Sequence, residues 1–160
     1  IMIPKEKLQT MKYVKAEYNA LQNDPILSLG CTVGLPNPNN LLHWKISLVG
    51  PQDTPYAGGM FFLTVDFPVG YPKIKPEVRF VNKIYHLNVR EKDGHICIST
   101  LNQWVPETPM VDVISAIFAL FYEQNPLSPY SLTMATQYKL RRGDFDKCAR
   151  EWTQKYASMN

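Results

Sequence analysis

The chain has 160 residues, of which 45% are hydrophobic and 19% are charged; these values suit one globular domain and exclude a disordered chain. The net charge of +3 is spread along the sequence without a dense basic stripe, so we expect no nucleic-acid partner. Three cysteines make a poor disulfide framework, and no apolar run reaches the ~20 residues that span a bilayer. With no secretory signal pattern at its start, we expect the protein in the cytoplasm, the nucleus or both, without a membrane partner.

The first predicted element is an amphipathic helix over residues 5–23. Apolar residues recur there at spacings of three and four, which places them on one face of a helix. An Asn-Asp-Pro sequence then ends the helix, because the residue before a proline is disfavoured in the helical conformation. The apolar stripe consists of Leu8, Met11, Val14, Tyr18 and Leu21.

Alternating apolar and polar residues next predict an antiparallel meander of about four short strands. The clearest alternation places Trp44, Ile46 and Leu48 on one face, with Lys45 and Ser47 on the other. Turn-rich stretches of proline, glycine and asparagine separate the strands. The predicted strands cover residues 31–35, 44–48, 61–67 and 78–80.

Residues 85–109 have no clean period and no obvious secondary structure. Long irregular segments in small domains are usually either functional or disordered. This segment contains Ile96, Ile98, Leu101 and Trp104, so we expect it to be ordered and packed. It is therefore the first candidate for a functional site.

Helical spacing returns after this segment and predicts three C-terminal helices. One covers residues 110–121 and is apolar enough to be buried, and a short one covers residues 132–140. Asp144 is expected to cap a last helix. The core stripe of that helix is expected to consist of Phe145, Cys148, Trp152 and Tyr156. The sum is an α+β domain: an N-terminal helix, a four-stranded antiparallel meander, a long ordered segment with the active site, and C-terminal helices.

The reactive side chains gather in YHLNVREKDGHIC, residues 85–97. A zinc site would need about four ligands, and His86, His95 and Cys97 offer three without a recurring ligand spacing. A Cys–His nucleophile would need an oriented histidine and a third group. A cysteine that carries an acyl group would need a donor for the developing oxyanion, and the Asn88 amide donates at any pH. Composition alone does not decide among these three.

Seven short motifs follow one another along nearly the whole chain: Trp44, GPQDTPYAGGMFFLTVDFP, YPKIKP, YHLN, GHIC, WVP and the closing AREWTQKYA. Each motif is weak alone, but their order and spacing are specific. In this order the chain resembles the ubiquitin-conjugating enzyme family, and most closely its broad-range ubiquitin members. The resemblance implies a single conjugating-enzyme core domain over residues 1–160, with a short N-terminal extension of the first helix.

The resemblance implies roles for three residues at the site. Cys97 would accept ubiquitin from the activating enzyme as a thioester and pass it to a substrate lysine, usually with a ligase. Asn88 would stabilise the oxyanion, order the loop, or both. Ser128 aligns with a gate position where the family uses Asp, Ser or Glu; a serine can orient the lysine but is a poor base at neutral pH.

The approach of the substrate lysine is expected to be lined by Tyr85 and Tyr130. Ser99 lies near a position that is acidic in the family, so the local negative charge is lower here. We therefore expect weak lysine reactivity unless a ligase compensates.

The resemblance also implies partners: ubiquitin, the activating enzyme, a RING-type or HECT-type ligase, and lysines of protein substrates. No bound cofactor is expected, because ATP is consumed upstream by the activating enzyme. No metal is expected either, and we expect a monomer. Several contact residues differ from those common in the family, so we expect a changed set of ligases. The expected contacts with the ligase or activating enzyme are Lys12, Tyr13, Lys73, Val105, Pro106 and Glu107.

Two other functions share this fold: a conjugating enzyme for a SUMO-like or NEDD8-like modifier, and a non-catalytic variant that binds in the ubiquitin pathway. The ubiquitin-type last helix argues against the first, and Cys97 argues against the second. One departure touches the site directly: Leu87 replaces the proline of the family's H-P-N motif, so the backbone gains an N–H that needs a partner. His86 is expected to hydrogen-bond the loop, and His95 only to lie near the site.

Overall fold

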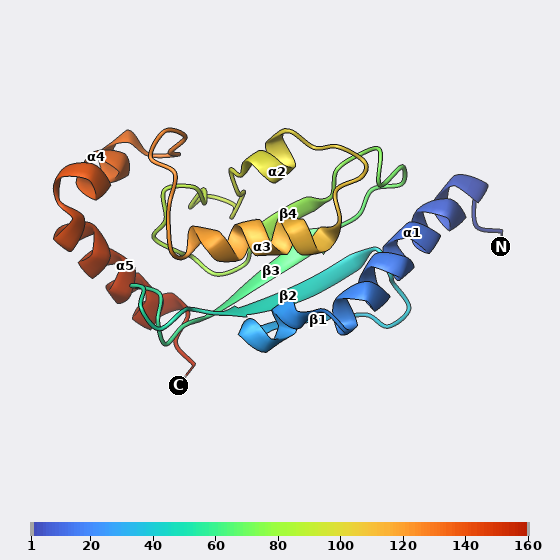
Figure 1. The fold of residues 1–160 in the computed structure, drawn as a ribbon, viewed down its shortest axis with the longest axis horizontal. Helices are drawn as coiled ribbons and strands as arrows, with labels where there is room; N and C mark the ends of the chain where they lie inside the picture. The colour runs from blue at the N-terminus through green and yellow to red at the C-terminus, as the bar shows by residue number, and fades with distance from the viewer. Residues whose placement is uncertain (1, 160) are drawn as a thin grey trace.

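A helix, a four-stranded sheet and a group of C-terminal helices follow one another along the chain (Figure 1). The structure is a computed structural model and describes residues 2–159. The predicted α+β class and the order of its elements are confirmed. The elements are α1 (Lys5–Gln22), the 3₁₀ helix η1 (Pro25–Leu29), β1 (Cys31–Gly34), β2 (His43–Val49), β3 (Met60–Asp66), β4 (Glu77–Phe80), α2 (Ser99–Asn102), α3 (Met110–Leu120), α4 (Leu132–Leu140) and α5 (Arg142–Tyr156).

The four strands form one antiparallel sheet in the order β1-β2-β3-β4. Because side chains alternate along a strand, the predicted apolar set reaches one face. Trp44, Ile46 and Leu48 are fully buried, and Lys45 between them is exposed. The register pairs Trp44 with Val65 and Leu48 with Phe61, which stacks the apolar positions of neighbouring strands.

Helix α3 lies across one face of the sheet (Figure 1). Its four buried residues belong to the same core as the inward-facing strand residues. Burying an apolar side chain of this size contributes roughly 1.5–3 kcal/mol, so the contact between sheet and helix stabilises the fold. The four residues are Met110, Val113, Ile114 and Ile117.

The first helix is confirmed, but its apolar stripe is shorter than predicted. Val14 and Leu21 are buried, whereas Leu8 is 44% exposed. The N-terminal turns extend beyond the sheet and have no core to cover (Figure 1). Thr10 is buried instead, and its hydroxyl accepts a hydrogen bond from the N–H of Gly70 at 3.0 Å.

The last helix corrects two predictions. It begins at Arg142, so Asp144 lies in its first turn and is not its cap. Its buried face is formed by Phe145, Ala149 and Thr153, one residue further round than the predicted stripe. Cys148 is therefore only partly buried and is not a core residue. Beyond Phe145 the expected stripe failed, because α5 packs through the small residues Ala149 and Thr153, while Trp152 and Tyr156 are only partly buried.

The irregular segment after β4 is ordered, as predicted. Ile96, Ile98 and Leu101 are buried, and the short helix α2 begins at Ser99, which the sequence did not indicate.

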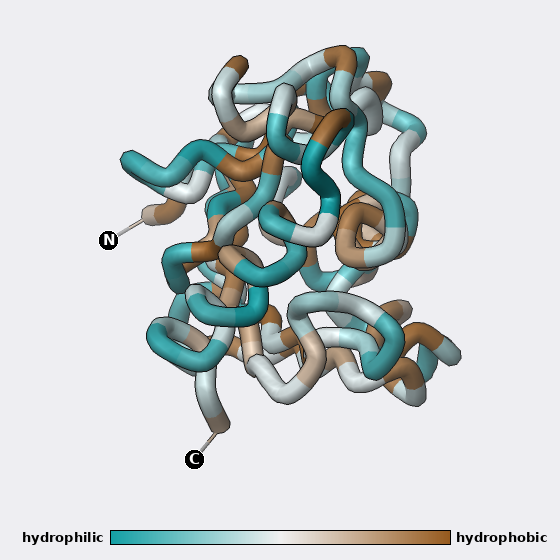
Figure 2. The backbone as a smooth tube through the Cα atoms, turned by 90° about the vertical axis from the view of Figure 1, so that its left-hand side faces the viewer, coloured by the Kyte–Doolittle hydropathy of each residue, from teal (hydrophilic) through white to brown (hydrophobic). Residues whose placement is uncertain are grey.

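Figure 2 shows that hydrophilic residues lie mostly on the outer turns of the backbone. Within residues 2–159, no helix is both long and apolar enough to cross a membrane.

Candidate active site

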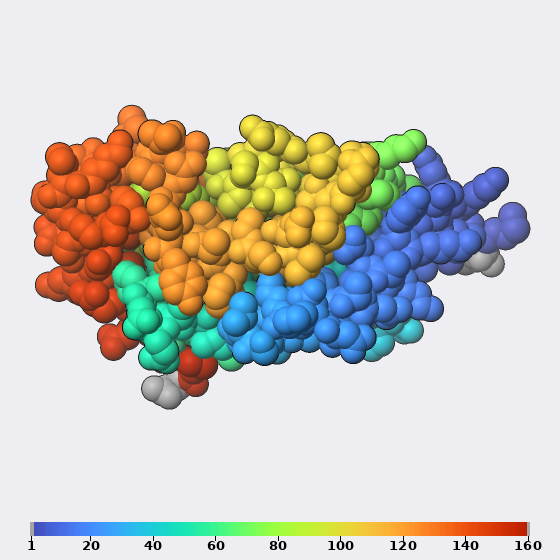
Figure 3. Space-filling model, in the orientation of Figure 1, coloured from blue at the N-terminus to red at the C-terminus, as the bar shows by residue number. Residues whose placement is uncertain are grey.

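The cysteine at the centre of the candidate site is held by a nearly extended backbone. Ile96 and Ile98, its two neighbours, are 1% and 7% exposed, so the side chain of Cys97 points to the opposite side and is partly exposed. The N–H of Cys97 donates to the carbonyl of Asn88 at 2.8 Å, and Val89 forms a β-bridge with Ile96. The core thus fixes the cysteine while leaving its thiol accessible. The segment around residue 100 reaches the surface beside residues 105–125 (yellow and orange in Figure 3).

Asn88 is fully buried and joins two loops. Its side-chain NH₂ donates to the carbonyls of Asn125 (2.9 Å) and Ser128 (3.1 Å), and its Oδ1 accepts from the N–H of Asn125 (2.8 Å). Both amide hydrogens are therefore used inside the protein. This is the geometry of a loop brace, and the oxyanion role stays a prediction.

His86 is also buried, and its two ring nitrogens have backbone partners. Nδ1 lies 3.0 Å from the N–H of Asn88, and Nε2 lies 2.8 Å from the carbonyl of Leu120. The first contact requires an acceptor and the second a donor, which assigns a neutral ring with its proton on Nε2. Burial lowers the pKa of His86 to about 4, against the opposing effect of the Leu120 hydrogen bond. The expected structural role of His86 is confirmed.

Leu87 is fully buried, and the N–H that it adds has a partner. That N–H donates to Oε1 of Gln124 at 2.8 Å, and Nε2 of Gln124 donates to the hydroxyl of Tyr56 at 2.7 Å. The Tyr56 hydroxyl in turn donates to the carbonyl of Tyr85 at 2.6 Å, and the Leu87 carbonyl accepts from the N–H of Tyr130 at 2.9 Å. Sequence reasoning missed Gln124. The extra buried donor at Leu87 was the signal that an acceptor had to exist.

The exposed rim beside the thiol carries a second set of polar contacts. His95 lies two residues before Cys97 on the same side of the backbone, and its Nδ1 shares a hydrogen bond with the Tyr130 hydroxyl. The guanidinium of Arg90 lies 5.5 Å from the centre of the Tyr130 ring and forms two hydrogen bonds with Asp93, at 2.9 and 2.7 Å. Burial, first, and the nearby cysteine raise the pKa of Tyr130. His95 is thus tied to a predicted site residue, which the sequence did not indicate.

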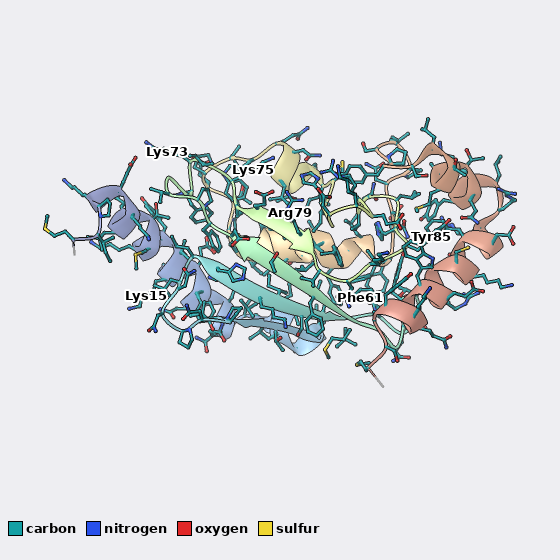
Figure 4. All side chains as sticks on the ribbon, turned by 180° about the vertical axis from the view of Figure 1, so that it is seen from behind. Lys15, Phe61, Lys73, Lys75, Arg79 and Tyr85 are labelled. Carbon is teal, nitrogen blue, oxygen red and sulfur yellow. The ribbon has the colours of Figure 1, made fainter. Side chains whose placement is uncertain are left out.

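The remaining predicted catalytic and approach residues lie in different surroundings. Ser128 and Ser99 are exposed, one in the loop braced by the buried asparagine and the other at the start of α2. Tyr85 packs against α5, with ring centres 5.1 Å from Phe145 and 5.2 Å from Trp152 (Figure 4). Its contacts lie with the C-terminal helices, so a place on the lysine approach stays a prediction for this residue.

One residue in direct contact with the thiol was not predicted. Nδ2 of Asn102, the last residue of α2, lies 3.3 Å from Sγ of Cys97. Asn102 is exposed and sits five residues after the cysteine, which is one helical turn beyond the start of α2. No sequence period marked this short helix, so no signal pointed to Asn102. Among residues 2–159, no three His, Cys, Asp or Glu side chains gather to hold a metal ion.

Most of the predicted partner contacts meet in one groove. A groove of about 810 Å³ between α1 and two loops is lined by Tyr13, Lys73, Pro106 and Glu107, among others. Trp104 ties the two loops together, because its Nε1 donates to the carbonyl of Pro72 at 2.7 Å. Figure 4 shows Lys73 at the outer edge of its loop. The two other predicted contacts, Lys12 and Val105, are exposed beside this groove but do not line it.

Comparison with known proteins agrees with this arrangement. Residues 13–153 match the family model for ubiquitin-conjugating enzymes. The structure superimposes on a Plasmodium yoelii protein described as a ubiquitin conjugating enzyme, with a TM-score of 0.81, 28% sequence identity and full coverage of both chains. It also superimposes on the E2 domain of a Toxoplasma gondii ubiquitin conjugating enzyme, with a TM-score of 0.79, 27% identity, and coverage of 92% of this chain and 98% of that one. The chain therefore belongs to the ubiquitin-conjugating enzyme family.

Proposed function

We propose that the protein accepts ubiquitin on Cys97 as a thioester and passes it to a substrate lysine. The observation that carries this proposal is the placement of Cys97, because the buried neighbours Ile96 and Ile98 turn its thiol outward while the backbone is fixed to Asn88. A thiolate there would attack the thioester that joins ubiquitin to the activating enzyme. The activating enzyme's sulfur would leave, and a lysine amine would later displace Cys97 with formation of an isopeptide bond.

The surroundings of the thiol support transfer to lysine with help from a ligase. Ser128 is exposed in the braced loop, but its hydroxyl is hardly ionised at neutral pH and cannot act as an efficient base. Within the described residues, the carboxylate on the rim, Asp93, is held by Arg79 and Arg90. Lysine transfer without a ligase should therefore be slow.

The groove between α1 and the two loops is the proposed contact surface for the activating enzyme and the ligase. Lys73 and Glu107 on its walls give it both signs of charge, and Tyr13 adds an aromatic ring. Charge pairs on a surface groove favour particular partners more than they raise affinity. We propose that these residues select the ligase, which is of the RING or HECT type.

The test is a thioester assay with a ubiquitin-activating enzyme, ATP and ubiquitin. The expected product is an adduct of the protein that reductant removes. Cys97→Ser should give a reductant-stable ester or no adduct, whereas Cys148→Ser, a change at a partly buried cysteine on α5, should leave the adduct intact.

The same assay separates the other functions. An adduct with a SUMO-like or NEDD8-like modifier and its own activating enzyme, but none with ubiquitin, would show that the modifier is wrong. If the folded protein formed no adduct with any modifier, the proposed enzymatic function would be contradicted. A non-catalytic binding variant would then be the remaining function.

A further inference from the structure

We propose that Asn102 is a catalytic residue whose side-chain amide stabilises negative charge on the sulfur of Cys97. The inference rests on the proposed function, because it assigns Asn102 a part in the same transfer. It depends on one contact, Nδ2 of Asn102 to Sγ of Cys97 at 3.3 Å.

The hydrogen-bond partners of the two nearby asparagines decide which one can serve the sulfur. Asn88 is fully buried and spends both amide hydrogens on the carbonyls of Asn125 and Ser128. Asn102 is exposed, and the structure gives its amide the sulfur of Cys97 as partner. The donor available to a thiolate is therefore on α2, and the buried asparagine supports the loop opposite.

Backbone hydrogen bonds in α2 hold Asn102 in place. The N–H of Asn102 donates to the carbonyl of Ile98 at 2.9 Å, and that of Leu101 to the same carbonyl at 3.2 Å. Leu101 is buried at 6% exposure and anchors the short helix to the core. The single turn of α2 thus places the Asn102 amide beside the sulfur of Cys97.

The chemistry uses this contact in both steps. In the first step a thiol proton goes to solvent, the Cys97 thiolate attacks the thioester carbonyl, the new C–S bond forms, and the activating enzyme's sulfur leaves with the electron pair. In the second step the lysine nitrogen attacks, the C–N bond forms, the C–S bond to Cys97 breaks, and the amine proton goes to solvent. The sulfur carries negative charge at the start of the first step and at the end of the second. A hydrogen bond to a charged atom is stronger than one to a neutral atom, so the amide favours the charged sulfur in both steps.

The Asn102 variants keep the other charged and titratable groups near the site. They come from the loop after β4, from β4 itself, from the loop before it, and from the loop before α4. They are Arg90, Asp93, His95, Arg79, Lys75 and Tyr130.

The test measures the rate of Cys97 alkylation by iodoacetamide against pH in the full chain, with the site of alkylation identified by mass spectrometry. Asn102→Leu removes the donor at similar size, and Asn102→Asp places an acidic group there. At neutral pH the rate should fall about three- to tenfold in the first variant and further in the second, with the same plateau at high pH. Cys148 in the same molecule is the internal reference, and Asn39→Leu, at an exposed asparagine between β1 and β2, is the matched control variant.

Single-turnover thioester formation with ubiquitin should slow by the same ratio in the two Asn102 variants. An unchanged alkylation profile in both variants would overturn the inference, and so would a changed profile with unchanged thioester formation. Alkylation needs no ubiquitin. A parent protein that forms no ubiquitin adduct would therefore refute the proposed function, while the effect of Asn102 on the thiolate would still be read.

Discussion

The candidate site has two sides that differ in how their polar groups are used. On the inner side, His86, Leu87 and Asn88 are buried, and their polar atoms are paired within the protein. On the outer side, Cys97 is partly exposed and Asn102 is exposed, with side chains that can meet a substrate. A reactive thiol needs both, because a fixed frame positions it and an open rim admits its partners. We therefore expect changes on the inner side to alter stability, and changes on the outer side to alter transfer rates.

The largest expected effect is on stability and tests the inner side at Gly94, whose buried backbone precedes the exposed cysteine. Gly94 has φ of +76°, and a Cβ there would lie 2.0 Å from the carbonyl oxygen of Phe80. Phe80 also donates its N–H to the Gly94 carbonyl at 2.9 Å, so the two backbone segments cannot move apart freely. Gly94→Ala should lower the free energy of unfolding by about 4 kcal/mol or more, measured by urea denaturation.

Gly143→Ala is the matched control, since a Cβ there meets nothing within 4 Å in α5. It should leave stability unchanged or raise it by up to about 1 kcal/mol. A Gly94→Ala variant as stable as the parent would show that this buried backbone can move.

The inner side should make stability depend on pH through His86. Its pKa in the folded protein is about 4, below the ordinary value of 6.5, so the unfolded chain binds the proton first as pH falls. The free energy of unfolding should therefore fall by about 3 kcal/mol between pH 6.5 and 4, while above pH 6.5 the contribution is fully present.

Denaturation of His86→Gln across the same pH range measures this contribution, because the variant should lose that part of the pH dependence. His43→Gln, at an imidazole at the start of β2 beside Asp66, is the control. If His86→Gln keeps the full pH dependence of the parent, the ring is not the group that titrates.

The buried pair of Leu87 and Gln124 tests the inner side more finely. Leu87→Pro leaves Oε1 of Gln124 without its donor, and Gln124→Leu leaves the N–H of Leu87 without its acceptor. Each change should cost about 1–3 kcal/mol, because an unpaired buried polar group loses its solvation.

The double variant should cost less than the sum of the two, which a double-mutant cycle detects as a coupling energy of about 0.5–3 kcal/mol. Gln52→Leu, an exposed glutamine in the turn after β2, controls for the loss of an amide. Strict additivity would mean that Leu87 and Gln124 are not coupled through this hydrogen bond.

The smallest effect on stability is expected on the outer side, at Ser128. Ser128→Asp should change the free energy of unfolding by less than about 0.5 kcal/mol, because the side chain is exposed and its backbone carbonyl still accepts from Asn88. Discharge of the Cys97 thioester to free lysine should rise about tenfold or more, since a positioned base contributes ~10²–10⁴-fold. Ser128→Ala should not show this rise. Equal discharge rates in the Asp and Ala variants would place the limiting step elsewhere.

The sequence predicted the secondary-structure elements around the site better than the contacts within it. The order of elements, the inward faces of β2 and β3 and an ordered segment after β4 follow from local periodicity, which a single sequence contains. The face of α5 and the exposure of Leu8 did not follow from it, because they depend on which element lies opposite. Gln124 was missed because its partner Leu87 is distant in sequence, and Asn102 was missed because no period marks the short helix α2.

By itself, the sequence determined the fold class and the family and pointed to Cys97 as the candidate cysteine, since alternation, helical spacing and the order of seven motifs can all be read along the chain. Tertiary structure alone decided what each of the two buried amides does. It buried Asn88 as a brace and placed Gln124 under Leu87. The reason is physical, because a buried donor or acceptor must be paired, and only the packing of distant segments determines which partner it meets.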